Sequence, residues 1–123
     1  MGALRVLIVE SNLSLGQVWQ RHLERHGMKT RLETNQVGAT AALVSDSYDV
    51  VILNLVLRGS STLAISDLAS MRNPDSRVIF VTDTSFFSDG SVFSLCPNVC
   101  AYLQVDTPPD DLTAMVEHYG SHV

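Results

Sequence analysis

The stretch Val50-Val-Ile-Leu-Asn-Leu55 is an almost continuous apolar run in which Asn54 is the one polar residue. Three further runs rich in Val and Ile occupy residues 5–9, 78–82 and, more weakly, 101–105. Apolar runs without alternation are typical of strands buried on both faces, as in a parallel sheet covered by helices. A fifth segment, residues 28–33, alternates polar and apolar side chains and predicts a partly exposed edge strand.

Segments whose apolar residues have helical spacing separate these runs. Their apolar faces are expected at Leu15, Val18, Trp19, Leu23 and His26; at Val37, Ala41, Ala42 and Val44; at Leu63, Ile65, Leu68 and Met71; and at Leu112, Met115, Val116 and Tyr119. A further helix over residues 88–95 has less support, because Ser and Gly lower its helix propensity. Strands and helices therefore alternate five times, which predicts one α/β domain over residues 1–123 with a doubly wound parallel sheet.

The balance of charge excludes two classes of partner. The 123 residues include 13 acidic and 8 basic side chains, for a net charge of −5. Nucleic acids and anionic membranes attract clustered positive charge, so we expect neither as a partner. No apolar run reaches the ~20 residues of a membrane span, and no signal peptide is recognisable, so we expect a cytoplasmic protein. Residues 78–123 hold no Lys or Arg, which predicts an acidic surface on the last third of the chain.

Cysteines and histidines give little support for a metal site. Cys96 and Cys100 are separated by three residues and lie far in sequence from the four histidines. We expect structural thiols, with a metal or redox pair as the alternative. The histidine pairs at spacing i, i+4 (His22 with His26, His118 with His122) are expected to be solvated.

Ligands of doubly wound folds bind outside the carboxyl ends of the strands. In this sequence, the residues expected at those ends are Glu10, Ser11, Asn54, Thr82, Asp83, Val105 and Asp106. Glu10 is expected to be a solvated carboxylate at a strand end, with a cation-binding role as the alternative.

The order and spacing of these stretches resemble the CheY-like receiver domain of bacterial response regulators over essentially the whole chain. The resemblance rests on Val6-Leu-Ile-Val-Glu10, Tyr48-Asp-Val-Val-Ile-Leu-Asn54, Val78-Ile-Phe-Val-Thr82 and Tyr102-Leu-Gln-Val105. It implies a single flavodoxin-like (βα)5 domain with a five-stranded parallel sheet, acting in two-component signal transduction or a phosphorelay. In typical receivers, carboxylates hold Mg²⁺, an aspartate accepts a phosphoryl group, and a lysine and a hydroxyl neutralise the phosphoryl oxygens.

This sequence keeps little of that phosphorylation pocket. Glu10 matches the first acid and Thr82 the hydroxyl, but Ser11 replaces the second acid and Val105 the lysine. Asn54 stands at the phosphoacceptor position, and an amide has no ionisable oxygen that could attack a phosphoryl group.

Two further positions argue against phosphorylation. Asp83 stands where receivers carry a small residue, and its charge would repel a phosphoryl group. Lys29 is the only lysine of the chain, so no shift of the alignment supplies the missing one. We therefore expect a degenerate pocket with no catalytic residue, no cofactor and no Mg²⁺, in which Glu10 is the one weak metal candidate.

The resemblance then implies a pseudo-receiver that is not an enzyme and regulates by protein–protein contact without phosphorylation. The expected partner face contains Tyr102, Asp106, Asp110, Asp111 and Glu117, which favours a basic surface on the partner protein. A homodimer through the face of the fourth helix, fifth strand and fifth helix is a further expectation. Thr82 and Tyr102 stand at the positions that couple in switching receivers; we expect plain packing and hydrogen bonding there, with a retained conformational switch as the alternative. The aromatic pair Phe86-Phe87 is a candidate contact.

Two other functions compete with this interpretation. One is a receiver phosphorylated with Mg²⁺ at a non-standard residue, for which Glu10 and Asp83 are the candidates. The other is a flavodoxin-like protein that binds a small molecule, although no glycine-rich phosphate-binding motif is present.

Overall fold

The computed structural model describes residues 4–54, 62–73, 76–82, 99–104 and 107–120. Its elements are β1 (Arg5–Val9), α1 (Leu13–Arg25), β2 (Lys29–Glu33), α2 (Gln36–Ser45), β3 (Val50–Asn54), α3 (Thr62–Arg72), β4 (Arg77–Thr82), β5 (Val99–Gln104) and α5 (Pro109–Gly120). The helix expected over residues 88–95 and the aromatic pair Phe86-Phe87 lie outside the described residues.

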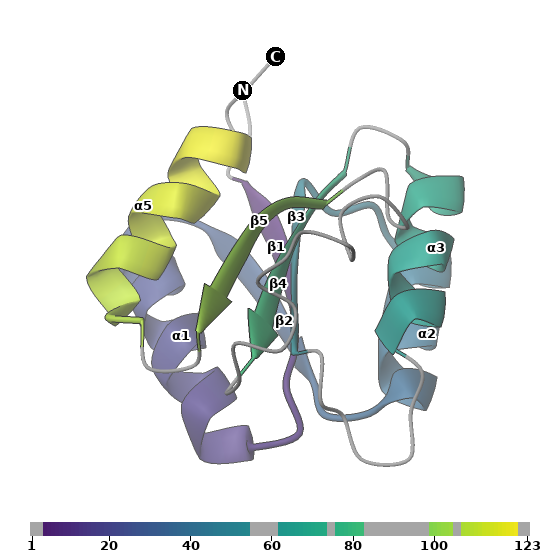
Figure 1. Ribbon diagram of the computed structural model, residues 1–123, viewed down its shortest axis with the longest axis horizontal. Helices are drawn as coiled ribbons and strands as arrows, with labels where there is room; N and C mark the ends of the chain where they lie inside the picture. The colour runs from purple at the N-terminus through teal and green to yellow at the C-terminus, as the bar shows by residue number, and fades with distance from the viewer. Residues whose placement is uncertain (1–3, 55–61, 74–75, 83–98, 105–106, 121–123) are drawn as a thin grey trace.

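The five strands form one sheet in the order β2-β1-β3-β4-β5, and every neighbouring pair is parallel. Helices α1 and α5 cover one face of this sheet, and α2 and α3 cover the other (Figure 1). This arrangement confirms the flavodoxin-like, doubly wound α/β fold. The strand order reverses at β1, which has β2 on one side and β3 on the other. The carboxyl ends of β1 and β3 therefore border the crevice where such folds bind ligands.

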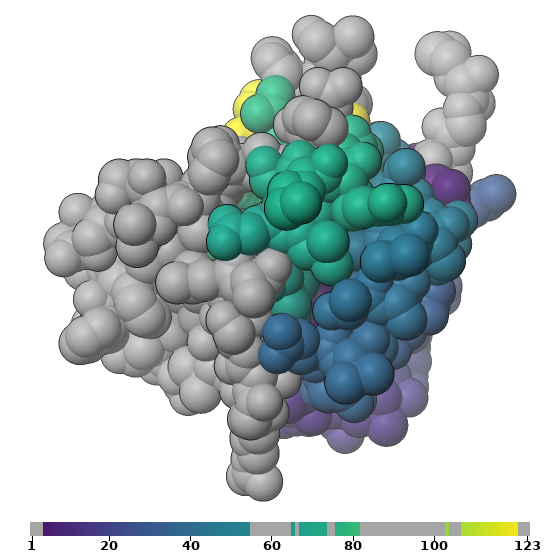
Figure 2. Space-filling model, turned by 90° about the vertical axis from the view of Figure 1, so that its right-hand side faces the viewer, coloured from purple at the N-terminus to yellow at the C-terminus, as the bar shows by residue number. Residues whose placement is uncertain are grey.

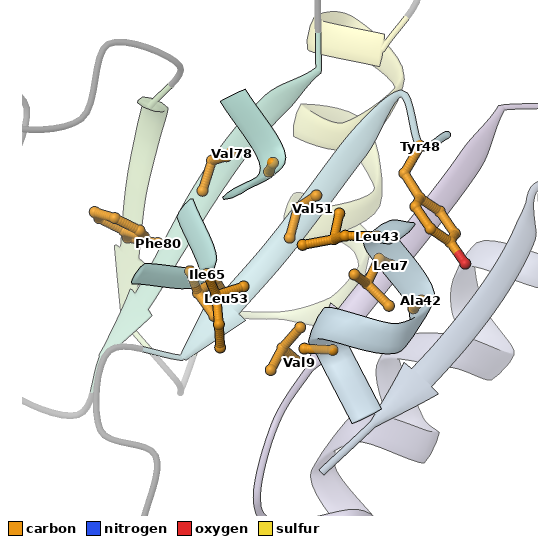
Figure 3. Close-up of a cluster of buried hydrophobic side chains, with 12 residues drawn as sticks. Leu7, Val9, Ala42, Leu43, Tyr48, Val51, Leu53, Ile65, Val78 and Phe80 are labelled. Carbon is orange, nitrogen blue, oxygen red and sulfur yellow. The ribbon is translucent and has the colours of Figure 1, made fainter. Parts of the chain in front are cut away.

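The core consists of two layers, one on each face of the sheet. All five residues of β3 are buried, which explains why this strand is an apolar run without alternation. The layer under α2 and α3 contains Leu7, Leu43, Val51, Leu53 and Phe80 among others, with Tyr48 beside Leu7 at its margin (Figure 3). The layer under α1 and α5 contains Trp19, which is 2% exposed, as the sequence predicts.

Local signals place the helix ends. The side chain of Asn12 accepts a hydrogen bond from the backbone N–H of Leu15, and Asn35 does the same for Gly38, so each asparagine caps the helix that follows it. Gly27 has a φ of 82°, a left-handed conformation that favours glycine, and it follows α1 as predicted.

The predicted apolar faces of three helices need correction. In α2, Val37 is 80% exposed and Val44 is 52% exposed, and the buried residues are Ala39, Ala42 and Leu43. Val18 of α1 and Met71 of α3 are also exposed. These apolar side chains lie on outer surfaces of the molecule, of which Figure 2 shows the side formed by α2 and α3. His26, expected on the inner face of α1, is exposed as well.

The position of β2 in the sheet agrees with its sequence pattern. Strand β2 lies at one edge of the sheet and none of its five residues is fully buried, as its alternating pattern predicts. Among the residues that the structure describes, no helix is long and apolar enough to cross a membrane.

Candidate functional site at the carboxyl ends of the strands

Glu10 follows β1 directly and is only 2% exposed. Its backbone N–H donates to the carbonyl of Glu33 at 3.0 Å, so the pairing of β1 with β2 continues one residue past the strand. Its Oε1 atom accepts a hydrogen bond from the backbone N–H of Asn12 at 2.9 Å. The prediction of a solvated carboxylate is therefore wrong, because continued strand pairing draws Glu10 into the protein.

Asn54 ends β3 and is 7% exposed. Its side-chain amide donates from Nδ2 to Oε2 of Glu10 at 2.5 Å, across 44 residues of sequence. Each carboxylate oxygen of Glu10 thus accepts a hydrogen bond from the protein, one from Asn54 and one from Asn12. We refer to this arrangement of Glu10, Asn54 and the Asn12 N–H as the Glu10–Asn54 clasp.

The two hydrogen bonds of the clasp stabilise the buried carboxylate of Glu10. A buried carboxylate is costly unless its oxygens are hydrogen-bonded. Donors to an ionised acceptor form stronger hydrogen bonds than neutral pairs do. Asn54 and the Asn12 N–H supply two such donors, and neither adds a second negative charge. The asparagine at the end of β3 therefore suits the buried carboxylate of Glu10, where an aspartate would oppose it.

Some of the other residues predicted at the site are described by the structure, and some lie outside the described residues. Ser11 is exposed next to Glu10. Thr82 is the last residue of β4. The residue before it, Val81, pairs with Asn54, so the carboxyl ends of β3 and β4 lie side by side. Tyr102 pairs with Phe80 within the sheet. Asp83, Val105 and Asp106 lie outside the described residues.

No group of three or more His, Cys, Asp and Glu side chains that could hold a metal ion occurs in the described part of the chain. His22 instead lies with Nε2 2.9 Å from Oδ1 of Asp110. His26 places Nδ1 2.9 Å from the carbonyl oxygen of His22. Cys96 and His122 lie outside the described residues.

The predicted acidic face is described at α5. Asp110 and Asp111 lie in the first turn of this helix and are exposed, as is Glu117 further along it. Negative side chains in a first turn are favourable because they oppose the partial positive charge of the helix N-terminus. Sequence reasoning missed the contact between Asp110 and His22 of α1, because only the packing of α1 against α5 brings these residues together.

Sequence reasoning also missed Asn12 as a part of the site. Its side chain caps α1 while its own N–H holds Glu10. The capping role is readable from an asparagine ahead of a helical segment. The contact with Glu10 depends on the path of the chain after β1 and has no sequence signal.

Comparisons with solved structures find receiver domains. A CheY-like response regulator receiver domain protein from Methanospirillum hungatei matches 97% of this chain and 94% of its own, with a TM-score of 0.87 and 20% identity. The response regulator TrrA from Thermotoga maritima, solved in complex with Mg²⁺ and a beryllium fluoride, matches 94% and 98% of the two chains, with a TM-score of 0.81 and 21% identity.

A response regulator from Burkholderia pseudomallei, solved with a phosphorylated aspartic acid, has a TM-score of 0.82 and 19% identity over 96% of this chain and 69% of its own. No protein-family model matches the sequence. A comparison with curated proteins finds no match either. The chain thus has the fold of response regulator receiver domains, as its sequence pattern predicts.

Proposed function

We propose that this chain is a pseudo-receiver, a regulatory module of two-component-type signalling that acts through protein contacts without phosphorylation at the end of β3. The observation that supports this most directly is the Glu10–Asn54 clasp. The residue at the phosphoacceptor position of the fold is an amide, and it donates a hydrogen bond to the acidic residue that follows β1.

Two chemical consequences support the proposal. An amide side chain cannot act as the oxygen nucleophile of an acyl phosphate, so Asn54 cannot take the role of the acceptor. Mg²⁺ prefers charged oxygen ligands, and it would have to compete with Asn54 and Asn12 for the oxygens of Glu10. We therefore propose that the module uses no Mg²⁺ and catalyses no reaction.

Phosphorylation of Glu10 itself has little support. Its carboxylate is buried and each oxygen is held by a protein donor, so a phosphodonor would first have to open the clasp. The other candidate for non-standard phosphorylation, Asp83, lies outside the described residues.

The proposed output is contact with a protein partner through the acidic face around α5. Asp111 and Glu117 are exposed on this helix, and Asp110 adds a third carboxylate beside His22. A partner with a basic contact surface would complement these charges. Tyr102 and Asp106 belong to the proposed face by their position in the sequence, and a homodimer through the same region is part of the proposal.

Acetyl phosphate is the direct test of phosphorylation independence. Incubation of the protein with acetyl phosphate and Mg²⁺, followed by intact-mass measurement, should give no species heavier by one phosphoryl group. A phosphorylatable receiver domain in the same buffer serves as the positive control. A stoichiometric, hydroxylamine-labile adduct on the parent chain would overturn the proposal, and peptide mapping would then show which carboxylate carries it.

A further inference from the structure

A cluster of cations lies at the end of the sheet where the strands begin, opposite the clasp. Arg5 begins β1 and Lys29 begins β2, and the strand register pairs these two residues directly. Arg31 follows on β2, and Arg72 ends α3. Lys29 and Arg72 are exposed, and Arg31 is half-buried. Because all the strands are parallel, this cluster lies at the amino ends of the strands, away from Glu10 and Asn54.

Two cavities adjoin at this edge and share Arg5 and Asp46. The first has a volume of 210 Å³ and is lined by Arg5, Lys29, Thr30, Arg31, Asp46 and Tyr48. Three of its six lining residues are cations, of which Arg5 is paired with Asp46 at 3.1 Å and Arg31 with Glu33 at 2.7 Å. The net positive charge that an anion would meet in this cavity is therefore that of Lys29, while the two paired guanidinium groups can still donate hydrogen bonds. The guanidinium of Arg5 also lies over the ring of Tyr48, 5.8 Å from its centroid, which fixes one wall of this cavity.

The second cavity has a different chemistry. It has a volume of 310 Å³, and its polar lining residues are Arg5, Ser45, Asp46, Ser47 and Arg72. This cavity therefore offers a carboxylate and two hydroxyls as well as two guanidinium groups. Acceptors and donors of this kind suit the hydroxyl groups of a ligand better than a second anionic group.

The charged groups of this edge are already partly organised. Arg5 pairs with Asp46 at 3.1 Å, and Asp49 accepts a hydrogen bond from the backbone N–H of Arg5. Arg72 donates a hydrogen bond to the carbonyl of Val44, where its positive charge interacts favourably with the partial negative charge at the end of α2. Arg31 forms an ion pair with Glu33 at 2.7 Å, and the side-chain hydrogen bond in this pair raises the pKa of Arg31. No hydrogen bond or ion pair engages the ammonium group of Lys29 within the described part of the chain.

We propose that these two cavities form a binding site for a small phosphate ester that carries hydroxyl groups, such as a sugar phosphate. The phosphoryl group lies in the cavity of Arg5, Lys29 and Arg31. The hydroxyl-bearing part of the molecule lies in the neighbouring cavity, where Asp46 and Ser47 accept its hydrogen bonds. This site is independent of the clasp and of the proposed partner face, so it neither requires nor tests them.

Three probes separate the two halves of the proposed site. Isothermal titration calorimetry at low salt and without Mg²⁺ compares ribose 5-phosphate, inorganic phosphate and ribose. Ribose 5-phosphate should bind with one-to-one stoichiometry and at least about tenfold more tightly than inorganic phosphate, and ribose alone should not bind detectably. Equal affinities for ribose 5-phosphate and inorganic phosphate would overturn the assignment of the second cavity.

Two variants with matched controls test the residues. Lys29→Gln should weaken ribose 5-phosphate binding by about three- to tenfold, as expected for loss of one exposed charge contact. Arg25→Gln removes the same charge from the exposed surface of α1, outside both cavities, and should change the affinity less than about twofold. If Arg25→Gln weakens binding as much as Lys29→Gln, or if no probe binds, the proposed site is wrong.

Asp46→Asn distinguishes a specific role of Asp46 from a general increase in positive charge. Removal of this carboxylate should strengthen inorganic phosphate binding, because a like charge is lost beside the phosphoryl cavity. It should reduce the preference for ribose 5-phosphate over inorganic phosphate, because the acceptor for hydroxyl groups is weakened. A rise in both affinities by the same factor would contradict the role given to Asp46. Circular dichroism and urea unfolding of each variant establish that it is folded.

Discussion

The Glu10–Asn54 clasp predicts that the carboxylate and the amide can be swapped between positions 10 and 54 with little loss of stability. It also predicts that two carboxylates at these positions destabilise the fold. Asn54→Asp would replace the amide donor by a second carboxylate next to a residue that is 2% exposed. The variant loses a charge-assisted hydrogen bond and gains a buried like-charge contact. We expect a loss of about 3 to 5 kcal/mol of unfolding free energy at pH 7, as for other buried charges deprived of a partner.

Glu10→Gln should be far milder. The glutamine oxygen can still accept from the Asn12 N–H, and its NH₂ group can donate to Asn54 once the Asn54 amide turns its oxygen inward. We expect a loss of about 1 kcal/mol. The double variant Glu10→Gln with Asn54→Asp restores one carboxylate, one amide and both hydrogen bonds. Its unfolding free energy should therefore lie within about 1 kcal/mol of the parent, well above the sum of the two single losses.

Urea unfolding measures all four proteins in one assay. Trp19 is the only tryptophan and is buried in the core under α1, so its fluorescence reports loss of the fold. The double-mutant cycle should give a coupling free energy of about 3 to 6 kcal/mol in favour of the exchanged pair. If the double variant is as unstable as the two single losses added together, Glu10 and Asn54 do not interact as the structure has them.

The sheet could be predicted from the sequence because its central strands are buried on both faces. Such strands give short apolar runs rich in Val and Ile, and β3, with all five residues buried, is the clearest example. Helix α2 shows the opposite case. It is apolar on nearly every side, so its pattern did not reveal that Ala39 and Leu43 face the core while Val37 and Val44 face outward.

The candidate site was predicted only in part, for a physical reason. The rule for doubly wound folds placed Glu10 and Asn54 at the same edge of the sheet. It did not predict their hydrogen bond, because the burial of Glu10 depends on its pairing with Glu33 one residue past the strand. The cation cluster at the other edge was missed altogether. Arg5 and Lys29 are 24 residues apart in sequence and become neighbours only through the register of β1 with β2.

Two further predictions concern cations and partners. Low millimolar Mg²⁺ should leave the melting temperature of the parent unchanged, because the oxygens of Glu10 are held by protein donors, but it should raise that of Asn54→Asp, which offers two adjacent carboxylates. An equal rise in both proteins, lost on Glu10→Gln, would show that the parent clasp binds the ion. The last prediction concerns the acidic face, where Asp111 is the sharper target because Asp110 contacts His22. Asp111→Lys should slow association with the partner protein several-fold, since long-range attraction steers encounter and is screened only beyond about 8 Å at physiological salt. Asp67→Lys makes the same charge change at an exposed position of α3, on the other face of the sheet, and should leave the rate near that of the parent. Stopped-flow or surface-plasmon measurements at two salt concentrations decide the matter: if both variants slow association equally, or if Asp111→Lys associates at the parental rate and salt has no effect, the partner does not bind through the acidic face of α5.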